Sequence, residues 1–232
     1  SNARRLNTTE YVLNNRLGYI SLNQALNNDQ VLAVSYQLTY NGKTYQVGEF
    51  SDQIPNNQQS LFCKLLKPST VNVRYPTWDL MMKNVYSIGG YQINAQDFKL
   101  EVYYNNASTG TDINYLPVSS CQDAIKGKPL LQVLSFDKLN SQNDQLPDGQ
   151  YDFIEGTTIL AANGRVIFPV TEPFGSYLES KFSSCNPTES NRYVFHQLYD
   201  STRIQAQQFP NLNRYKIKGS YKSSGGRSEE HT

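Results

Sequence analysis

The sequence is poor in the residues on which most enzyme active sites depend. It contains two histidines among its 232 residues. It has no Gly-x-Ser-x-Gly elbow, no His-Glu-x-x-His pair and no Gly-rich phosphate-binding loop. His231 lies in a polar tail, and His196 lies within a helical pattern, where a hydrogen-bonded structural histidine is more common than a general base. We therefore expect a protein that is not an enzyme.

Neither an excess of one charge nor a long apolar run is present. The 21 Lys and Arg balance 20 Asp and Glu, which leaves a formal net charge of +1. A chain without surplus positive charge lacks the field that attracts nucleic acid or anionic lipid. Its apolar runs also fall short of the roughly 18 residues that a membrane helix needs. We expect no nucleic-acid partner, and a soluble segment that does not itself span a membrane.

Cysteine is scarce, and its odd number excludes a fully paired set of intramolecular disulfides. Cys63, Cys121 and Cys185 have no Cys-x-x-Cys spacing, and a zinc site would need more ligands close together. One disulfide stays open as an alternative. Three free or buried thiols are favoured, because free cysteine packs as a small hydrophobe.

Tyrosine and phenylalanine are abundant, with 17 and 10 copies, and they occur in alternating patterns. In residues 31–40, larger apolar residues alternate with smaller or more polar ones, as in a strand with one buried face. Asn41-Gly42 suits the two positive φ angles of a type I′ turn, and residues 43–50 are predicted to form the returning strand. A second alternating strand contains Phe98, Leu100, Val102 and Tyr104. The sequence thus predicts at least one antiparallel hairpin and one half-buried strand.

Further strands and two helices complete the prediction. Residues 129–136 suggest a buried strand, and residues 151–160 and 165–170 flank Asn163-Gly164 as a second hairpin. After Pro76, the apolar residues Trp78, Met81, Met82 and Val85 have helical spacing, and we expect their side chains to be buried. A second helix is predicted over residues 192–208, ending before Pro210. The fold class is α+β, predominantly antiparallel β with hairpins and about two helices.

The domain organisation is predicted from composition. Residues 1–3 (Ser-Asn-Ala) resemble the remnant of a purification tag, and a missing signal peptide consequently says nothing about export. Residues 4–222 form the β-rich segment, with a candidate subdomain break near residues 105–128. Residues 223–232 are rich in Ser, Gly and charge, which predicts a flexible tail.

One segment, residues 137–155, is crowded with oxygen ligands. Calcium prefers six to eight oxygens from carboxylates, amides and carbonyls, and Asp148-Gly149 suits a tight turn around an ion. The spacing does not fit the helix-loop-helix calcium pattern, and an ordinary Asx-rich loop is the favoured interpretation, with calcium as the alternative. The candidate calcium ligands are Asp144, Asp148, Asp152 and Glu155. No other cofactor is expected.

Several strings resemble the SprA/Sov family of gliding-motility and type IX secretion proteins of Bacteroidetes. They occur in order over nearly the whole chain: residues 17–29 (LGYISLNQALNND), 31–37 (VLAVSYQ), 40–50 (YNGKTYQVGEF), 78–85 (WDLMMKNV), 139–140 with 143–144 (LN and ND), 147–156 (PDGQYDFIEG), 164–170 (GRVIFPV), 172–175 (EPFG) and 218–223 (KGSYKS).

The resemblance implies a role that composition alone does not. Members of this family are very large outer-membrane β-barrel translocons that export folded cargo. The implied location is the cell envelope, associated with the outer membrane on its periplasmic or extracellular face. The implied partners are the rest of the parent β-barrel, other secretion-system proteins and exported cargo. We expect an apolar patch on this segment where it meets the parent protein.

Two other functions compete with a non-catalytic translocon segment that supports or gates export. The many tyrosines and a calcium loop would suit a carbohydrate-binding or adhesin-like β domain. A glycosidase would need two carboxylates facing one cleft, and nothing in the sequence selects such a pair.

Overall fold

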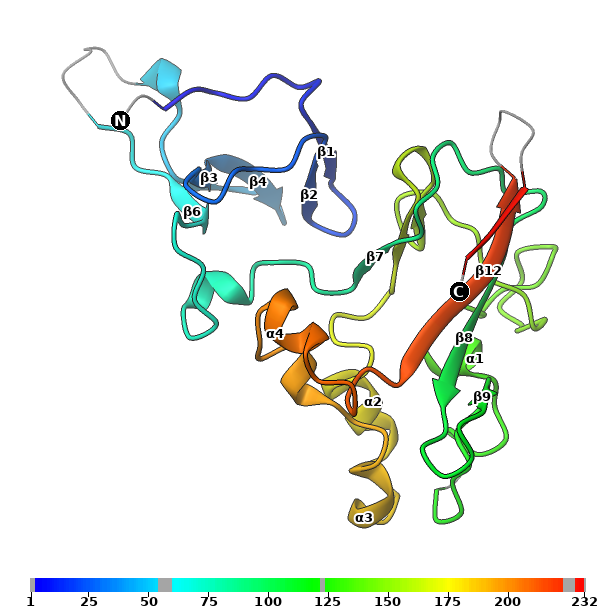
Figure 1. The fold of residues 1–232 in the computed structure, drawn as a ribbon. Coiled ribbons are helices and arrows are strands. Elements are labelled where there is room, and N and C mark those ends of the chain that lie inside the picture. The colour runs from blue at the N-terminus through cyan, green and yellow to red at the C-terminus, as the bar shows by residue number, and fades with distance from the viewer. Residues whose placement is uncertain (1–2, 54–59, 122–123, 223–227, 232) are drawn as a thin grey trace. The chain divides into compact units, whose positions relative to one another are not determined.

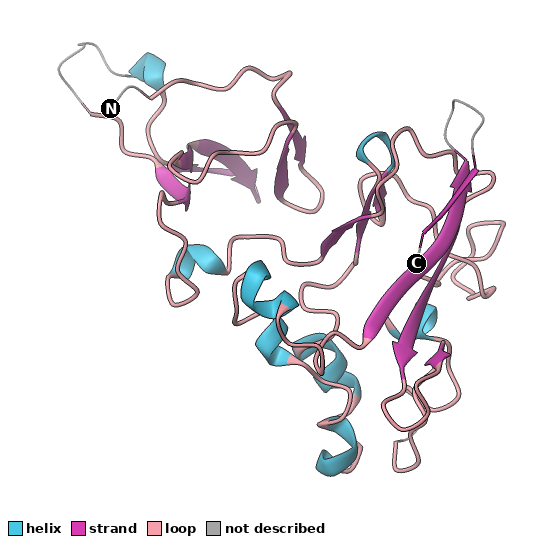
Figure 2. Ribbon diagram, viewed as in Figure 1, coloured by secondary structure: helices cyan, strands magenta, loops and turns pink. Residues whose placement is uncertain are grey.

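The computed structural model describes residues 3–53, 60–121, 124–222 and 228–231. The chain divides into two compact units, Ser1–Met82 (the first unit) and Lys83–Thr232 (the second unit). The boundary therefore follows Met82, and residues 105–128, the candidate break in the sequence, lie inside the second unit. Short antiparallel strands in small sheets, with four short α-helices among the described residues, make an α+β, β-rich fold (Figures 1 and 2).

The described residues of the first unit form three two-stranded antiparallel sheets. Their strand pairs are β1 with β2, β3 with β6, and β4 with β5. The elements are β1 (Tyr11–Asn14), β2 (Tyr19–Leu22), β3 (Leu32–Val34), β4 (Tyr36–Tyr40), β5 (Lys43–Val47) and β6 (Lys64–Lys67), with single-turn 3-10 helices at Ser51–Gln53 and Pro76–Trp78.

The hairpin of β4 and β5 confirms the predicted turn and strand pairing. Asn41 and Gly42 have φ angles of 49° and 73°, as a type I′ turn requires. Tyr36 lies opposite Val47, and Leu38 lies opposite Tyr45. The predicted burial of one face is wrong, however, because all five residues of β4 are exposed.

Very little apolar surface is buried in the first unit. Among the described residues, its only buried large apolar side chains are those of Tyr19 and Trp78. Its exposed ones are Val12, Leu13, Leu17, Val31, Tyr36, Leu38, Tyr40, Tyr45, Leu61, Phe62, Leu65, Val71, Tyr75, Leu80, Met81 and Met82. This unit therefore gains little of the hydrophobic free energy that offsets chain ordering.

A lysine holds together one corner of the first unit. The ammonium group of Lys67, at the end of β6, lies within hydrogen-bond distance of four main-chain carbonyl oxygens, which share its three N–H donors. The oxygens belong to Asn27, Asn28, Gln30 and Pro68, at 3.3, 3.2, 2.7 and 3.2 Å. The loop before β3 is thereby fixed to the strand that pairs with β3.

The second unit contains two larger sheets, with strand orders β10-β11-β7 and β13-β12-β8-β9. The strands are β7 (Val85–Ser87), β8 (Lys99–Asn105), β9 (Asp112–Ile113), β10 (Ile159–Leu160), β11 (Arg165–Ile167), β12 (Tyr215–Lys222) and β13 (Ser228–His231). The helices are α1 (Leu130–Val133), α2 (Ser176–Lys181), α3 (Pro187–Ser190) and α4 (Arg203–Gln207), with 3-10 helices at Ala161–Asn163 and His196–Leu198.

The core of the second unit confirms the alternation predicted for β8. Leu100, Val102 and Tyr104 are buried, while Lys99 and Glu101 are exposed. These inward residues pack in a cluster with the apolar side chains of α1, of α2 and of the segment after β11. The predicted hairpin around Asn163-Gly164 is also confirmed, in shorter form, by the antiparallel pair β10 and β11.

The predicted strand over residues 129–136 is wrong in conformation, although the segment is buried. Leu134 N–H donates to the carbonyl of Leu130 at 2.9 Å, as in a helical turn. Leu130 and Leu134 are fully buried. A short segment covered on all sides carries no periodicity that separates a strand from a helix.

Both predicted helices are also wrong in extent. After Pro76–Trp78 the chain becomes extended, because Asn84 bonds the main chain of Phe168 at the edge of the β7 sheet. Met81 and Met82 are exposed rather than turned inward. In place of one helix over residues 192–208 there is a 3-10 turn and then α4, which begins with a capping box of Thr202 and Gln205. None of the described helices has the length and apolar character needed to cross a bilayer.

A disulfide joins Cys121 and Cys185, and Cys63 is a free, exposed thiol. The favoured prediction of three free thiols is thus wrong, and the alternative of one disulfide is correct. The disulfide links two segments that are also joined by hydrogen bonds to Glu189. Its carboxylate accepts the main-chain N–H groups of Ser119 and Ser120 at 2.7 and 2.9 Å.

Part of the predicted flexible tail is paired. Residues 228–231 form β13, which lies antiparallel to β12 with Gly219 opposite His231. Residues 223–227 and 232, like residues 1 and 2 of the predicted tag remnant, lie outside the described residues.

Candidate functional site

The four predicted calcium ligands are dispersed over separate local hydrogen bonds. Asp144 accepts the side-chain amide of Asn140 at 3.2 Å, and Asp148 accepts Gln150 N–H at 2.9 Å. Asp152 accepts Lys138 N–H at 2.8 Å, and Glu155 accepts Ala161 N–H at 3.0 Å. Over the described ranges, no three His, Cys, Asp or Glu side chains converge to hold a metal. The structure does not assemble the predicted ligand set.

The main hydrogen-bond acceptor of this segment is Asp137, which was not among the predicted ligands. Its side chain is buried, with 2% exposure, and accepts the N–H groups of Asp148 and Gly149 at 3.0 Å each. Burial raises the pKa of nearby Asp152, against the lowering effect of its main-chain donors. The segment folds as an Asx-rich loop in which carboxylates satisfy main-chain donors. The position of Asp137, directly after the apolar Phe136, is the only sequence feature that marks it.

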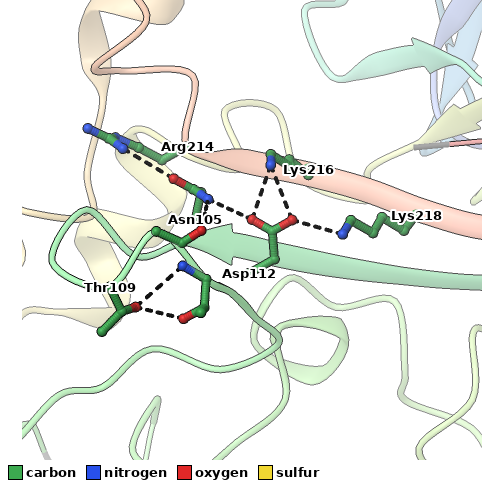
Figure 3. A network of polar contacts seen from close by, with 8 residues as sticks. Asn105, Thr109, Asp112, Arg214, Lys216 and Lys218 are labelled. Carbon is green, nitrogen blue, oxygen red and sulfur yellow. Dashed lines mark hydrogen bonds and ion pairs between the residues drawn. The ribbon is translucent and has the colours of Figure 1, made fainter.

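A polar network covers the outer face of the β8, β9 and β12 sheet (Figure 3). The carboxylate of Asp112 lies 3.1 Å from Lys216 Nζ and 2.8 Å from Lys218 Nζ, and it accepts the Asn105 amide at 2.8 Å. Arg214 donates to Asn105 at 3.3 Å. Hydrogen bonding by Lys218 and then Asn105 lowers the pKa of Asp112. A carboxylate held ionised between two ammonium groups is suited to fastening β9 to β12, not to proton transfer.

His196 lies at the surface of the second unit. Its Nε2 is 3.2 Å from Glu179 Oε2, and both side chains are substantially exposed, at 42% and 63%. An exposed pair of this kind contributes little to stability. The predicted structural role, as a hydrogen-bonded surface histidine, fits this placement.

The feature best suited to recognition is the apolar face of the β4 and β5 hairpin. This apolar hairpin face comprises Tyr36, Leu38, Tyr40 and Tyr45, which are 42%, 43%, 64% and 48% exposed. Side chains two apart on a strand share a face, and directly opposite residues point the same way. The opposite face is polar, where Thr39 and Thr44 hydroxyls lie 3.4 Å apart. The hairpin therefore has the amphipathic pattern of a half-buried sheet while its apolar side is open.

Comparison of the sequence with protein-family models and with curated proteins finds no significant match.

Proposed function

We propose that this chain is a non-catalytic segment of a type IX secretion and gliding-motility translocon of the outer membrane, where it supports or gates protein export. The proposal begins from the ordered strings that resemble the SprA/Sov family, such as residues 147–156 (PDGQYDFIEG). Its location would be the cell envelope, and its partners would be the rest of the parent protein, other secretion components and exported cargo.

The observation that carries the proposal is the apolar surface of the first unit. A two-stranded hairpin is marginally stable alone, and it needs further strands or a covering element on its apolar side. The apolar hairpin face has the composition of an interface core, since tyrosine combines a large contact area with a polar end. A segment of a larger protein would have this face covered by the remainder of that protein.

The disulfide supports a place in the envelope. Disulfides persist in oxidising compartments, which include the bacterial periplasm and the cell surface, and they are rare in the cytosol. The Cys121–Cys185 bond is consistent with either side of the outer membrane.

An in-frame deletion of this segment in the full-length gene tests the proposal. The parent protein is first quantified in the outer membrane, and secreted cargo and gliding are then assayed. Loss of secretion at normal membrane levels is the expected result. Intact secretion and gliding would contradict the proposal.

A matched pair of point variants gives a sharper test, because adjacent residues of β4 face opposite sides. Leu38→Asp places a charge on the apolar hairpin face, whereas Thr39→Asp places the same charge on the polar face. We expect Leu38→Asp in the full-length protein to lower secretion and Thr39→Asp to leave it near the wild-type level. Equal effects of the two variants would show that the face itself is not an interface.

A carbohydrate-binding or adhesin-like domain is the second candidate. Three tyrosines, at positions 36, 40 and 45, lie on one exposed face, and aromatic rings of this kind stack on sugar rings. Glycan-array binding by the isolated chain that is lost in Tyr40→Ala would favour this function over the first.

A further inference from the structure

A cavity of about 390 Å³ lies within the second unit. Its lining residues come mainly from β7, at the edge of one sheet, and from β12, the long strand of the other. This volume is in the lower part of the range of binding pockets in proteins. The lining also includes Phe98, directly before β8, Leu100 in β8, and Phe174.

One wall of the cavity is a strand edge with which none of the described strands pairs. β7 is the last strand in the order β10-β11-β7. Tyr86 lies opposite Val166, and Ile88 N–H donates to Gly164 at 2.9 Å, so these residues bond toward β11. Because ladder bonds alternate along an antiparallel strand, the N–H and C=O of Ser87 point away from β11. Ser87 lines the cavity.

The opposite wall is a second open edge, formed by the first part of β12. Asn105 N–H donates to the carbonyl of Arg214 at 2.8 Å. Because ladder bonds alternate, the main-chain groups of Arg214, Lys216 and Lys218 point toward β8. The main-chain groups of Tyr215 and Ile217 therefore point to the other side, where β13 pairs only from Gly219 onward. Among the described residues, no strand occupies the edge at Tyr215 and Ile217.

The cavity lining is rich in aromatic side chains and includes two lysines. Tyr86, Phe98, Phe174 and Tyr215 supply aromatic surface. The ammonium group of Lys218 lies 2.8 Å from Asp112, on the outer face of the sheet. Lys99 alternates with the buried Leu100 on β8, so its side chain points to that outer face as well. The chemistry offered is therefore main-chain donors and acceptors on two walls, together with an apolar aromatic surface.

We propose that this cavity, the strand-accepting groove, binds an extended peptide segment of a partner protein by strand addition. Unpaired edge groups at strand spacing are matched by another main chain, which presents donors and acceptors at the same repeat. Alternate side chains of the peptide would enter the aromatic cavity, so the recognised segment has apolar residues at every second position and no charge among them. The inference concerns the second unit and stands without the proposed role in secretion.

Selection with displayed random peptides on the full 232-residue chain tests the groove. Peptides of about 10 residues suffice, which is the upper length of ordinary strands. We expect selected peptides to show alternating apolar residues, and a synthetic copy of one to slow hydrogen exchange at the amides of Ser87, Tyr215 and Ile217. Absence of any selected binder, or binding without protection of these amides, would overturn the proposal.

A matched pair of variants at Ser87 adds an independent measurement. Ser87→Pro removes an N–H that points into the groove without removing a ladder bond, whereas Ser87→Ala keeps that N–H. We expect peptide affinity to fall about tenfold in Ser87→Pro, as the loss of one or two hydrogen bonds implies, and to change less than about twofold in Ser87→Ala. Equal affinity of the two variants would contradict strand addition at β7.

A second copy of the chain is the other occupant that the experiment distinguishes. If exchange protection at these amides rises with protein concentration in the absence of peptide, the groove is filled by self-association. That result would overturn the assignment to a partner peptide.

Discussion

Removal of the disulfide tests the packing of the second unit quantitatively. The bond between Cys121 and Cys185 spans a sequence separation of 64 residues. In the chain-entropy account, a cross-link over a loop of that length stabilises the folded state by about 4 kcal/mol at 25 °C. We therefore expect Cys121→Ser/Cys185→Ser to lower the free energy of unfolding of the second unit by up to about 4 kcal/mol.

Urea unfolding followed by near-UV circular dichroism measures this loss. The tyrosines of the core report on the second unit, whereas the single tryptophan, Trp78, lies in the first unit and reports there. With a denaturant slope of about 2 kcal/mol per molar, the midpoint should fall by about 2 M. Cys63→Ser is the control, because this thiol is free and exposed, and its midpoint should match the wild type.

A midpoint shift smaller than about 0.5 M would refute this reasoning, since it would correspond to about 1 kcal/mol. Thiol titration in denaturant gives a direct check on the bond itself. One reactive thiol per untreated chain is expected, from Cys63. Three reactive thiols, the full cysteine content, would show that the bond does not form.

Three further predictions concern other parts of the chain. The hydroxyl of Ser120 and the N–H groups of Ser119 and Ser120 lower the pKa of Glu189 from 4.5 to about 2, so its stabilising contribution is present above pH 4.5 and is lost as the pH falls toward 2. Glu189→Gln should reduce the dependence of the free energy of unfolding on pH in this range, as measured by urea unfolding. An unchanged slope would contradict a stabilising hydrogen bond from Ser119 and Ser120 to Glu189. Gly164→Ala should lower stability more than Gly110→Ala, because both residues have positive φ but only at Gly164 would a Cβ meet a neighbouring atom, 1.9 Å from Gly90 O. Gly110→Ala should cost about 1 kcal/mol, and equal losses in thermal unfolding would show that the close approach is relieved. Calorimetry should give no heat when calcium is added to chelator-treated protein, because Asp144, Asp148, Asp152 and Glu155 engage separate local donors; a measurable heat would restore the calcium hypothesis.

Local periodicity identified the strands correctly where one face of a strand is covered or where turn chemistry is strict. The alternation of Leu100, Val102 and Tyr104 predicted the inward face of β8, and Asn41-Gly42 predicted the type I′ turn. These features depend on near neighbours and on backbone geometry, which sequence records directly.

Features that depend on distant contacts were beyond the sequence patterns. The amide of Asn84 reaches Phe168, 84 residues away, and makes an extended edge where spacing suggested a helix. The pairing of Cys121 with Cys185 likewise requires two separate loops to meet. The alternation in β4 indicated a buried face, whereas all five residues of this strand are exposed, because alternation records the character of a face and not whether another element packs on it.

The predicted calcium-binding segment, residues 137–155, was predictable only in part. The composition of residues 137–155 indicated a loop rich in carboxylates, and the structure has that loop. Its organisation around Asp137 depends on burial against the core, which composition does not reveal.

The ammonium group of Lys67 acts as a cation that the chain carries with it. Four carbonyl oxygens converge on it, an arrangement that elsewhere holds a free metal ion. Because the charge is covalently attached to β6, the loop cannot lose it to a chelator or exchange it with the medium. The geometry of this corner therefore depends on the folding of β6 and not on the concentration of metal ions in the medium.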